Sequence, residues 1–174
     1  MQMINRYTGF TILLLALVSS FCVAADAQAN SKFEVFADSA LTKIVPTSFY
    51  FAGQSAPTQM RNTAAAQIGK ERYVIVGLVD TSGYSTEISG KYEGFFITDS
   101  PVLIGGKTLG TGAYGFGFAK GGKLNIFDLS SKQIFSTASK TDADMKRPRP
   151  LQMILADKGV RLYKGKDYVL IAPR

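Results

Sequence analysis

The stretch from residue 101 to residue 129 constrains the fold more than any other part of the sequence, because glycines recur there between short apolar runs. The glycines form three clusters: Gly105 with Gly106, Gly110 with Gly112, and Gly121 with Gly122. Glycine enters positive φ angles without steric cost, so each cluster is typical of a chain reversal. The pattern predicts a β-meander.

Within this stretch, three aromatic residues alternate with two glycines. In an extended strand, Tyr114, Phe116 and Phe118 share one face, and Gly115 and Gly117 lie on the other. The rings need cover from a core, and the glycines permit close approach of another backbone or of a ligand. Simple core packing is the favoured interpretation of the rings, and these five residues are the candidate ligand-binding residues of the alternative.

Apolar and β-branched runs elsewhere predict further short strands, separated by turn residues as in sandwiches and small barrels. The predicted strands are Lys32–Ala37, Ser48–Ala52, Tyr73–Val79, Tyr92–Thr98, Gln133–Ser139, Leu151–Leu155, Val160–Tyr163 and Tyr168–Ile171. The run Ala40–Val45 is expected to extend or pair with the first of them. Tyr73–Val79 is apolar almost throughout, which predicts a strand in the middle of a sheet.

One segment has helical character. Pro57 suits a first helical turn, Ala64–Ala66 are strong helix formers, and Met60, Ala64 and Ile68 recur every four residues. The sequence thus predicts an all-β fold, a mostly antiparallel sandwich or small barrel, with one short helix or crossover near residues 57–68.

The N-terminus has the features of a secretory signal peptide. Arg6 precedes the apolar run Phe10–Val18, and small residues around Ala27 and Ala29 offer cleavage sites. We expect residues 1–29 to be removed and residues 30–174 to form a single β-domain, periplasmic or secreted, without a transmembrane segment. The only cysteine, Cys22, lies in the removed part, so we expect no disulfide.

The residue types that are absent exclude many kinds of active site. The chain has no histidine, and after cleavage it has no cysteine, so Ser-His-Asp and Cys-His triads and thiol redox chemistry are excluded. We expect no catalytic residues, no metal site and no cofactor. A carboxylate-dependent enzyme remains as an alternative, with Glu87, Glu93 and Asp99 as examples of acidic residues that could pair.

Positive charge is the clearest indication of a partner. Lysine and arginine number 20 against 13 aspartate and glutamate residues, a net charge of +7. In the stretch from Lys140 to Pro150, the four cations Lys140, Lys146, Arg147 and Arg149 are candidate anion-binding residues for an anionic envelope surface or polymer. Each of these arginines precedes a proline, which favours extended backbone. We favour the interpretation of this segment as an edge strand protected by Pro148 and Pro150, because edge protection needs no partner, and anion binding is the functional alternative.

The residues from Gly106 to Tyr114 follow the pattern G-K-x-L-x-x-G-x-Y. This motif resembles a hairpin of small secreted bacterial β-sandwich proteins of uncharacterised families. The resemblance covers nine residues and implies a fold and export, but no activity.

Taken together, these features favour an exported, non-catalytic binding or interaction module of the bacterial cell envelope that contacts anionic partners. Sequence-specific binding of nucleic acid is not expected. A lipocalin-like carrier of a small apolar ligand, with a hollow interior lined by aromatic residues, and the carboxylate-dependent enzyme are the alternatives.

Overall fold

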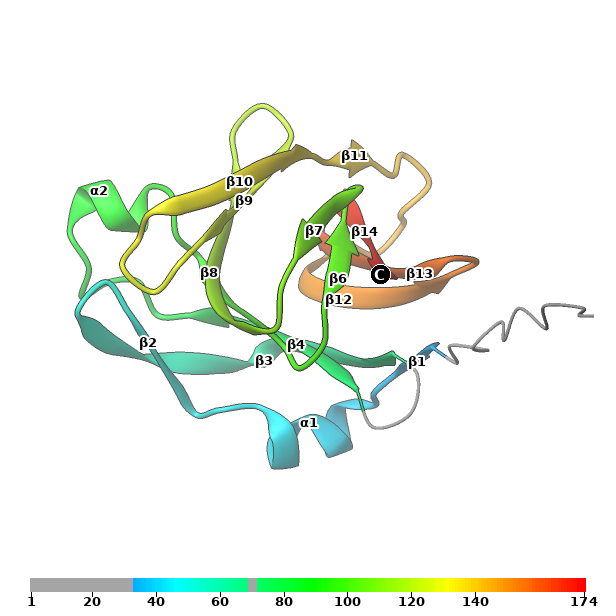
Figure 1. Cartoon of the computed structure of the whole chain (residues 1–174), viewed down its shortest axis with the longest axis horizontal. Helices are drawn as coiled ribbons and strands as arrows, with labels where there is room; N and C mark the ends of the chain where they lie inside the picture. The colour runs from blue at the N-terminus through cyan, green and yellow to red at the C-terminus, as the bar shows by residue number, and fades with distance from the viewer. Residues whose placement is uncertain (1–32, 69–71) are drawn as a thin grey trace, which may run out of the picture.

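Two antiparallel sheets make up most of the computed structural model, which describes residues 33–68 and 72–174 (Figure 1). The first sheet has the order β1 (Phe33–Val35), β3 (Gln54–Ile68), β4 (Tyr73–Val79), β5 (Gly94–Thr98), β8 (Gly112–Ala119), β9 (Lys123–Phe127) and β10 (Gln133–Ala138), and β2 (Ser48–Phe51) pairs with the start of β3. The second sheet has the order β12 (Arg149–Ala156), β13 (Gly159–Gly165), β14 (Asp167–Pro173), β6 (Val102–Ile104) and β7 (Lys107–Leu109), and β11 (Lys140–Thr141) pairs with β14. The described strands do not close into a barrel, so the prediction of an all-β fold is confirmed in its sandwich form.

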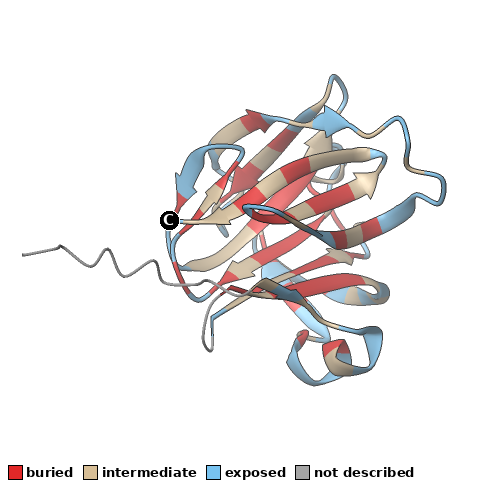
Figure 2. Ribbon diagram, turned by 90° about the vertical axis from the view of Figure 1, so that its right-hand side faces the viewer, coloured by how far each residue is buried: buried red, intermediate tan, exposed pale blue. Residues whose placement is uncertain are grey.

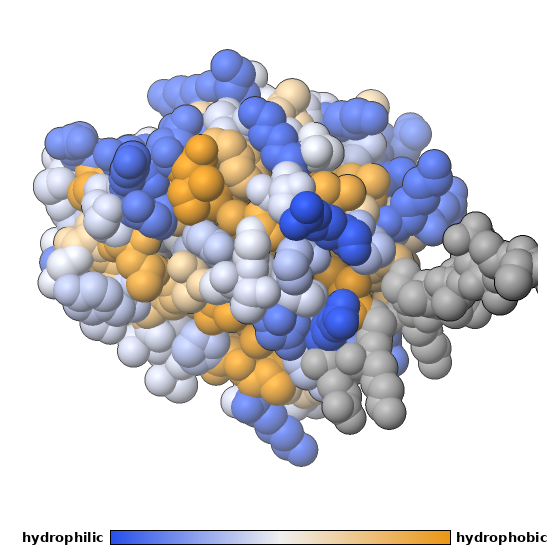
Figure 3. All heavy atoms as spheres, in the orientation of Figure 1, coloured by the Kyte–Doolittle hydropathy of each residue, from blue (hydrophilic) through white to orange (hydrophobic). Residues whose placement is uncertain are grey.

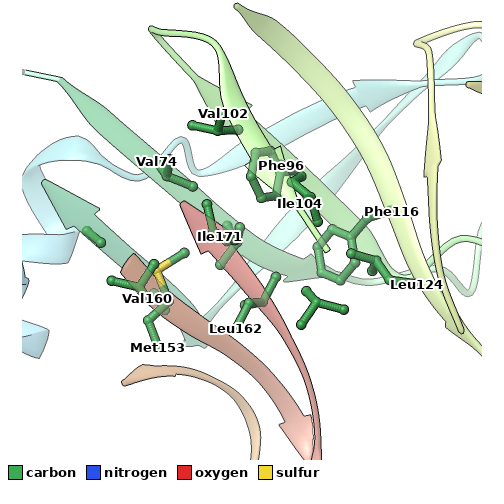
Figure 4. Close-up of a cluster of buried hydrophobic side chains, with 14 of the residues drawn as sticks. Val74, Phe96, Val102, Ile104, Phe116, Leu124, Met153, Val160, Leu162 and Ile171 are labelled. Carbon is green, nitrogen blue, oxygen red and sulfur yellow. The ribbon is translucent and has the colours of Figure 1, made fainter. Parts of the chain in front are cut away.

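The main core lies between the two sheets (Figure 4). Alternate residues of the strands that form it point into this core, as Val160 and Leu162 do on β13 and Val169 and Ile171 do on β14. Burial of such side chains contributes about 1.5–3 kcal/mol each. Figure 2 shows the buried residues along the strands, whereas exposed residues gather in loops and at strand ends.

The predicted helix near residues 57–68 is wrong, because this segment is the long strand β3. Ala64 and Ile68 are four residues apart, a spacing that places both on one side of a helix. Because side chains alternate between the two faces of a strand, residues an even number of positions apart also share one face of a strand. Ala64 and Ala66 are buried in the main core, and Ala65 is buried on the opposite face of the sheet. Burial on both faces overrides the helical propensity of alanine.

The expected continuation of the first strand over Ala40–Val45 is also wrong, because this run belongs to helix α1 (Asp38–Ile44). Leu41 and Val45 are buried and are four residues apart, so both reach one side of the helix. They contribute to a second apolar cluster on the outer face of the first sheet, together with Phe51 and Tyr92. The rings of Phe51 and Tyr92 stack with centroids 3.8 Å apart.

The glycine-rich stretch is only partly a meander. β6 pairs with β7, and β8 pairs with β9, but β7 belongs to the second sheet and β8 to the first. The segment from Gly106 to Tyr114 therefore crosses between sheets and is not a hairpin. Tyr114 fixes this crossing, because its hydroxyl donates to the carbonyl oxygens of Gly110 (3.1 Å) and Thr111 (3.3 Å).

The other predicted strands coincide with observed ones, and Tyr73–Val79 is β4, which has neighbours on both sides. The connection between β4 and β5 contains one short helix, α2 (Thr86–Ser89), capped by the hydroxyl of Ser85. The predicted signal peptide lies outside the described residues.

Candidate anion-binding site

The three rings predicted to share a face do so, and they contact the main core. Phe116 is fully buried there, and Tyr114 and Phe118 are partly buried and pack against the same cluster. The rings of Phe116 and Phe118 meet edge to face with centroids 6.3 Å apart. Apolar side chains of both sheets occupy this region, so a ligand of the carrier alternative has to lie outside the cluster.

The glycine face of β8 is approached closely, as expected, and the approaching atoms belong to the protein itself. The ring of Phe51 lies against Gly115, and the carbonyl oxygen of Lys91 lies against Gly117, so a Cβ atom at either position would clash. A ligand at this face would have to displace Phe51 or the backbone at Lys91 and Tyr92.

The acidic residues of the enzyme alternative lie on different elements, and each has a partner. Glu87 pairs with Lys91 (3.3 Å), Glu93 pairs with Lys164, and Asp99 accepts a hydrogen bond from the backbone of Tyr73 (2.8 Å). Glu93 and Asp99 flank the two ends of β5. At about 3.3 Å per residue their backbones are roughly 20 Å apart, well beyond the roughly 5–10 Å between the carboxylates of glycoside hydrolases.

The four predicted anion-binding residues are all exposed, and strand pairing divides them. Lys140 lies on β11, Lys146 and Arg147 lie in the loop that follows, and Arg149 begins β12. β12 is the edge strand of the second sheet and contains a register shift between Arg149 and Gln152. Pro150 lies within that edge strand, which agrees with the edge-strand interpretation.

Lys140 lines a cavity of about 530 Å³ at the second sheet, which Thr137 and Ala138 of β10 in the first sheet also line. Its volume is within the range usual for ligand sites. Two further cations line it, Lys158 in the turn between β12 and β13 and Arg161 on β13. We call this cavity the Arg161 pocket. Its lining also includes Tyr168, Leu170, the turn Gly105–Gly106 and one acidic residue, Asp157.

Arg161 is the most firmly positioned of the three cations. Its guanidinium carbon lies 4.8 Å from the centre of the Tyr168 ring, within cation–π range. Its Nη1 donates to the hydroxyl of Tyr163 (3.4 Å), and that hydroxyl donates to Oδ2 of Asp142 (2.9 Å). The hydrogen bond to Tyr163 raises the pKa of Arg161 further, so the guanidinium stays charged.

Strand register explains how these residues meet. On β13, Val160 and Leu162 point into the core, so Arg161 and Tyr163 project from the outer face of the sheet. Tyr163 pairs with Tyr168 on β14, which places Arg161 diagonally opposite that ring. Lys140 pairs with Tyr168 from the other side. Burial raises the pKa of the Tyr163 hydroxyl, which remains a neutral donor to Asp142.

The turn between β6 and β7 lies at one side of the pocket. Gly105 and Gly106 have φ angles of 55° and 84°, the left-handed conformation that favours glycine. Gly105 is tied to both sheets: its N–H donates to the carbonyl of Leu170 (2.9 Å), and its carbonyl accepts from the hydroxyl of Thr137 (3.3 Å). The predicted glycine turn therefore fixes one side of the pocket.

Arg149 lines a second cavity, of about 490 Å³, which we call the Arg149 pocket. Lys120, Lys164, Phe118, Pro148 and Pro150 also line it. The amino group of Lys164 forms an ion pair with Glu93, and the other oxygen of Glu93 accepts from the backbone of Phe118 (2.8 Å). Lys164 is therefore anchored across the two sheets, while Lys120 and Arg149 are exposed.

The large apolar side chains that are exposed among the described residues are spread over several elements: Ile44, Tyr50, Leu129, Ile134, Ile154 and Leu155. On the face drawn in Figure 3, apolar groups alternate with hydrophilic side chains. Within the described part of the chain, no cluster of three or more histidine, cysteine or acidic residues could hold a metal ion.

None of the helices in the described ranges has the length and apolarity needed to cross a bilayer. The chain matches no family model, no curated protein and no solved structure.

Of the three cations that line the Arg161 pocket, the sequence predicted Lys140 as a candidate anion-binding residue but did not indicate Lys158 or Arg161. Lys158 lies in a turn of ordinary composition, and Arg161 is a single cation in the run V-R-L-Y. The alternation of that run indicates that Arg161 points outward. Arg161 lies close to Tyr168 and Lys140 because of strand pairing, which no local sequence pattern specifies.

Proposed function

We propose that this protein is an exported, non-catalytic binding module that holds an anionic group of its ligand in the Arg161 pocket. The observation that carries the proposal is the fixed guanidinium of Arg161 between Tyr168 and Tyr163, at a cavity that Lys140 and Lys158 also line. Guanidinium groups bind carboxylate, sulfate and phosphate through paired hydrogen bonds.

The fixed position of the Arg161 side chain lowers the free-energy cost of ordering that side chain when a ligand binds. Immobilising a flexible side chain costs about 0.5–1.5 kcal/mol when a ligand binds. The Tyr168 ring and the Tyr163 hydroxyl already restrict Arg161 in the free protein. Lys140 and Lys158 are exposed, so salt screens their attraction more strongly. We therefore assign most of the affinity to Arg161 and mainly long-range attraction to the two lysines.

Several features of the sequence support export and binding without catalysis. The first 29 residues have the composition of a signal peptide, and the chain has no histidine. The pocket lining contains three cations and one carboxylate, Asp157, a set suited to holding an anion.

Retention on an immobilised carboxylated polysaccharide, measured across a salt series, tests the proposal. A charge-assisted hydrogen bond contributes about 1.5–3 kcal/mol, so Arg161→Gln should weaken binding by roughly tenfold to a hundredfold. The matched control is Arg61→Gln, which removes the same charge from an exposed position on β3. If both variants elute with the wild type, or both elute equally early, the Arg161 pocket is not the binding site.

A further inference from the structure

We infer that the ligand is a linear acidic polysaccharide whose chain continues from the Arg161 pocket, past the β13–β14 hairpin, into the Arg149 pocket. This inference rests on the proposed function of the Arg161 pocket and extends it to a second site. It identifies the ligand as a polymer with anionic groups at intervals, in place of a single small anion.

The strand order sets the distance between the two pockets. Lys140 on β11 pairs with β14, β14 pairs with β13, and Arg149 on β12 pairs with Gly165 of β13. Across the sheet, the backbones of Lys140 and Arg149 are thus three inter-strand spacings of about 4.8 Å apart, or roughly 14 Å. They are also offset along the strands, because Lys140 is level with Tyr163 of β13 and Arg149 is level with Gly165. A ligand with one anionic group cannot occupy both cavities.

The loop between β11 and β12 carries positive charge between the pockets. It is tied to the hairpin, because the N–H of Asp142 donates to the carbonyl of Lys166 (2.9 Å) and Nζ of Lys166 donates to the carbonyl of Ala143 (3.5 Å). Exposed Lys146 and Arg147 follow in the same loop. The cations from Lys140 to Arg149 therefore follow the path that connects the two pockets.

The nearby acidic residues leave this path positive. Asp142 accepts from the hydroxyl of Tyr163 (2.9 Å), and Asp167 accepts from the hydroxyl of Thr141 (2.6 Å). Asp144 and Asp157 are exposed. Glu93 forms an ion pair with Lys164 of the Arg149 pocket. With these five acids included, the two pockets and their loop still contain more cations than acids, the cations being Lys120, Lys140, Lys146, Arg147, Arg149, Lys158, Arg161, Lys164 and Lys166.

The aromatic residues favour a polysaccharide over a nucleic acid. Single-stranded nucleic acids bind through bases that stack on accessible rings. Here the ring of Tyr168 is occupied by the guanidinium of Arg161, Tyr163 is only 1% exposed, and Phe118 packs against the core. The two pockets instead offer cations with apolar walls, which suit charged groups on a saturated ring.

Binding of oligogalacturonides of increasing length, from the dimer upward, tests the inference by calorimetry at fixed ionic strength. Linking two weak sites raises affinity once the chain spans both. We expect at least a tenfold gain over a narrow range of lengths for the wild type. The double variant Lys120→Gln, Arg149→Gln should lose this gain with length, while Arg61→Gln should behave as the wild type.

The outcomes separate the two proposals. If affinity rises with length no faster in the wild type than in the double variant, the inference fails, although Arg161-dependent dimer binding would keep the proposed function. If dimer binding is unchanged by Arg161→Gln, the proposed function fails as well. Tighter binding of oligothymidylate or polyphosphate of equal charge overturns the choice of polysaccharide. Unchanged melting temperatures show that the variants are folded.

Discussion

The guanidinium of Arg161 lies over the ring of Tyr168, with 4.8 Å between the guanidinium carbon and the ring centre. The two residues come from neighbouring strands and meet on the outer face of the second sheet, where Tyr163 and Asp142 complete the support. An arginine held in this way presents its remaining donors in a fixed geometry, which distinguishes it from the mobile lysines around it.

Tyr163→Phe should weaken anion binding by less than Arg161→Gln does. The change removes the acceptor that orients Arg161 and the donor to Asp142, but it leaves the cation–π contact with Tyr168. We expect an affinity loss of about threefold to tenfold, since a neutral hydrogen bond contributes about 0.5–1.5 kcal/mol. Calorimetry with a short oligogalacturonide measures it. Tyr50→Phe, at an exposed tyrosine on β2, is the control. Unchanged affinity in Tyr163→Phe would show that the Tyr163 hydroxyl does not position Arg161 for binding.

Phe116→Ala should lower the free energy of unfolding by about 3–5 kcal/mol, because it removes a fully buried ring and leaves a cavity. Urea denaturation measures the change. Ile134→Ala, at a side chain 47% exposed, should change the free energy of unfolding by much less. Similar small effects for both variants would contradict the packing of the main core.

Gly117→Val should also destabilise the fold, by about 1–3 kcal/mol or more, because the added side chain meets the carbonyl oxygen of Lys91. A backbone atom cannot move aside as a flexible side chain can. Gly83→Ala is the control, since its nearest neighbour, an atom of Gln54, lies 3.9 Å from the added carbon. Equal thermal melting of wild type and Gly117→Val would show that β8 and the Lys91 backbone are farther apart than described.

Asp128 should make stability depend on pH in the acid range. Its Oδ1 accepts from the Ser130 hydroxyl (2.7 Å) and from the backbone N–H groups of Ser130 (2.9 Å) and Lys132 (3.0 Å). These bonds, with the Ser130 hydroxyl first, lower the pKa of Asp128 in the folded state. Its contribution is therefore present above the pKa of the unfolded state and is lost as pH falls through the lower, folded-state pKa.

Denaturation of wild type and Asp128→Asn between pH 6 and pH 2 measures this contribution. The wild type should be the more stable at pH 6, and the difference should shrink as the pH falls. A difference that is constant over this range would show that the Asp128 carboxylate has no special role in the turn between β9 and β10.

The sequence predicted the sheet strands well where both faces of a strand are buried by apolar residues, as in Tyr73–Val79. It failed at Ala64–Ala66, because small residues suit a helix in isolation and also suit a strand that other elements approach closely on both sides. It also failed over Ala40–Val45, which predicts an extended run, whereas Leu41 and Val45 are four residues apart and reach one side of helix α1.

Only some of the cations at the candidate site could be indicated by the sequence, for a related reason. Charge clustering along the chain identified Lys140 and Arg149, but strand pairing places them at two separate cavities. Arg161 and Lys158 join Lys140 through register between strands distant in sequence. Such long-range pairing is set by the whole sheet, so a local pattern could not indicate it.

An NMR titration with digalacturonate tests the central claim most directly, because it shows where an anionic ligand binds. We predict saturable shifts of the Arg161 side-chain N–H signals and of the backbone amides of Gly105, Gly106, Lys140 and Leu170, all lost in Arg161→Gln. Shifts spread evenly over the exposed lysines and arginines, or shifts that persist in Arg161→Gln, would contradict a binding site at the Arg161 pocket.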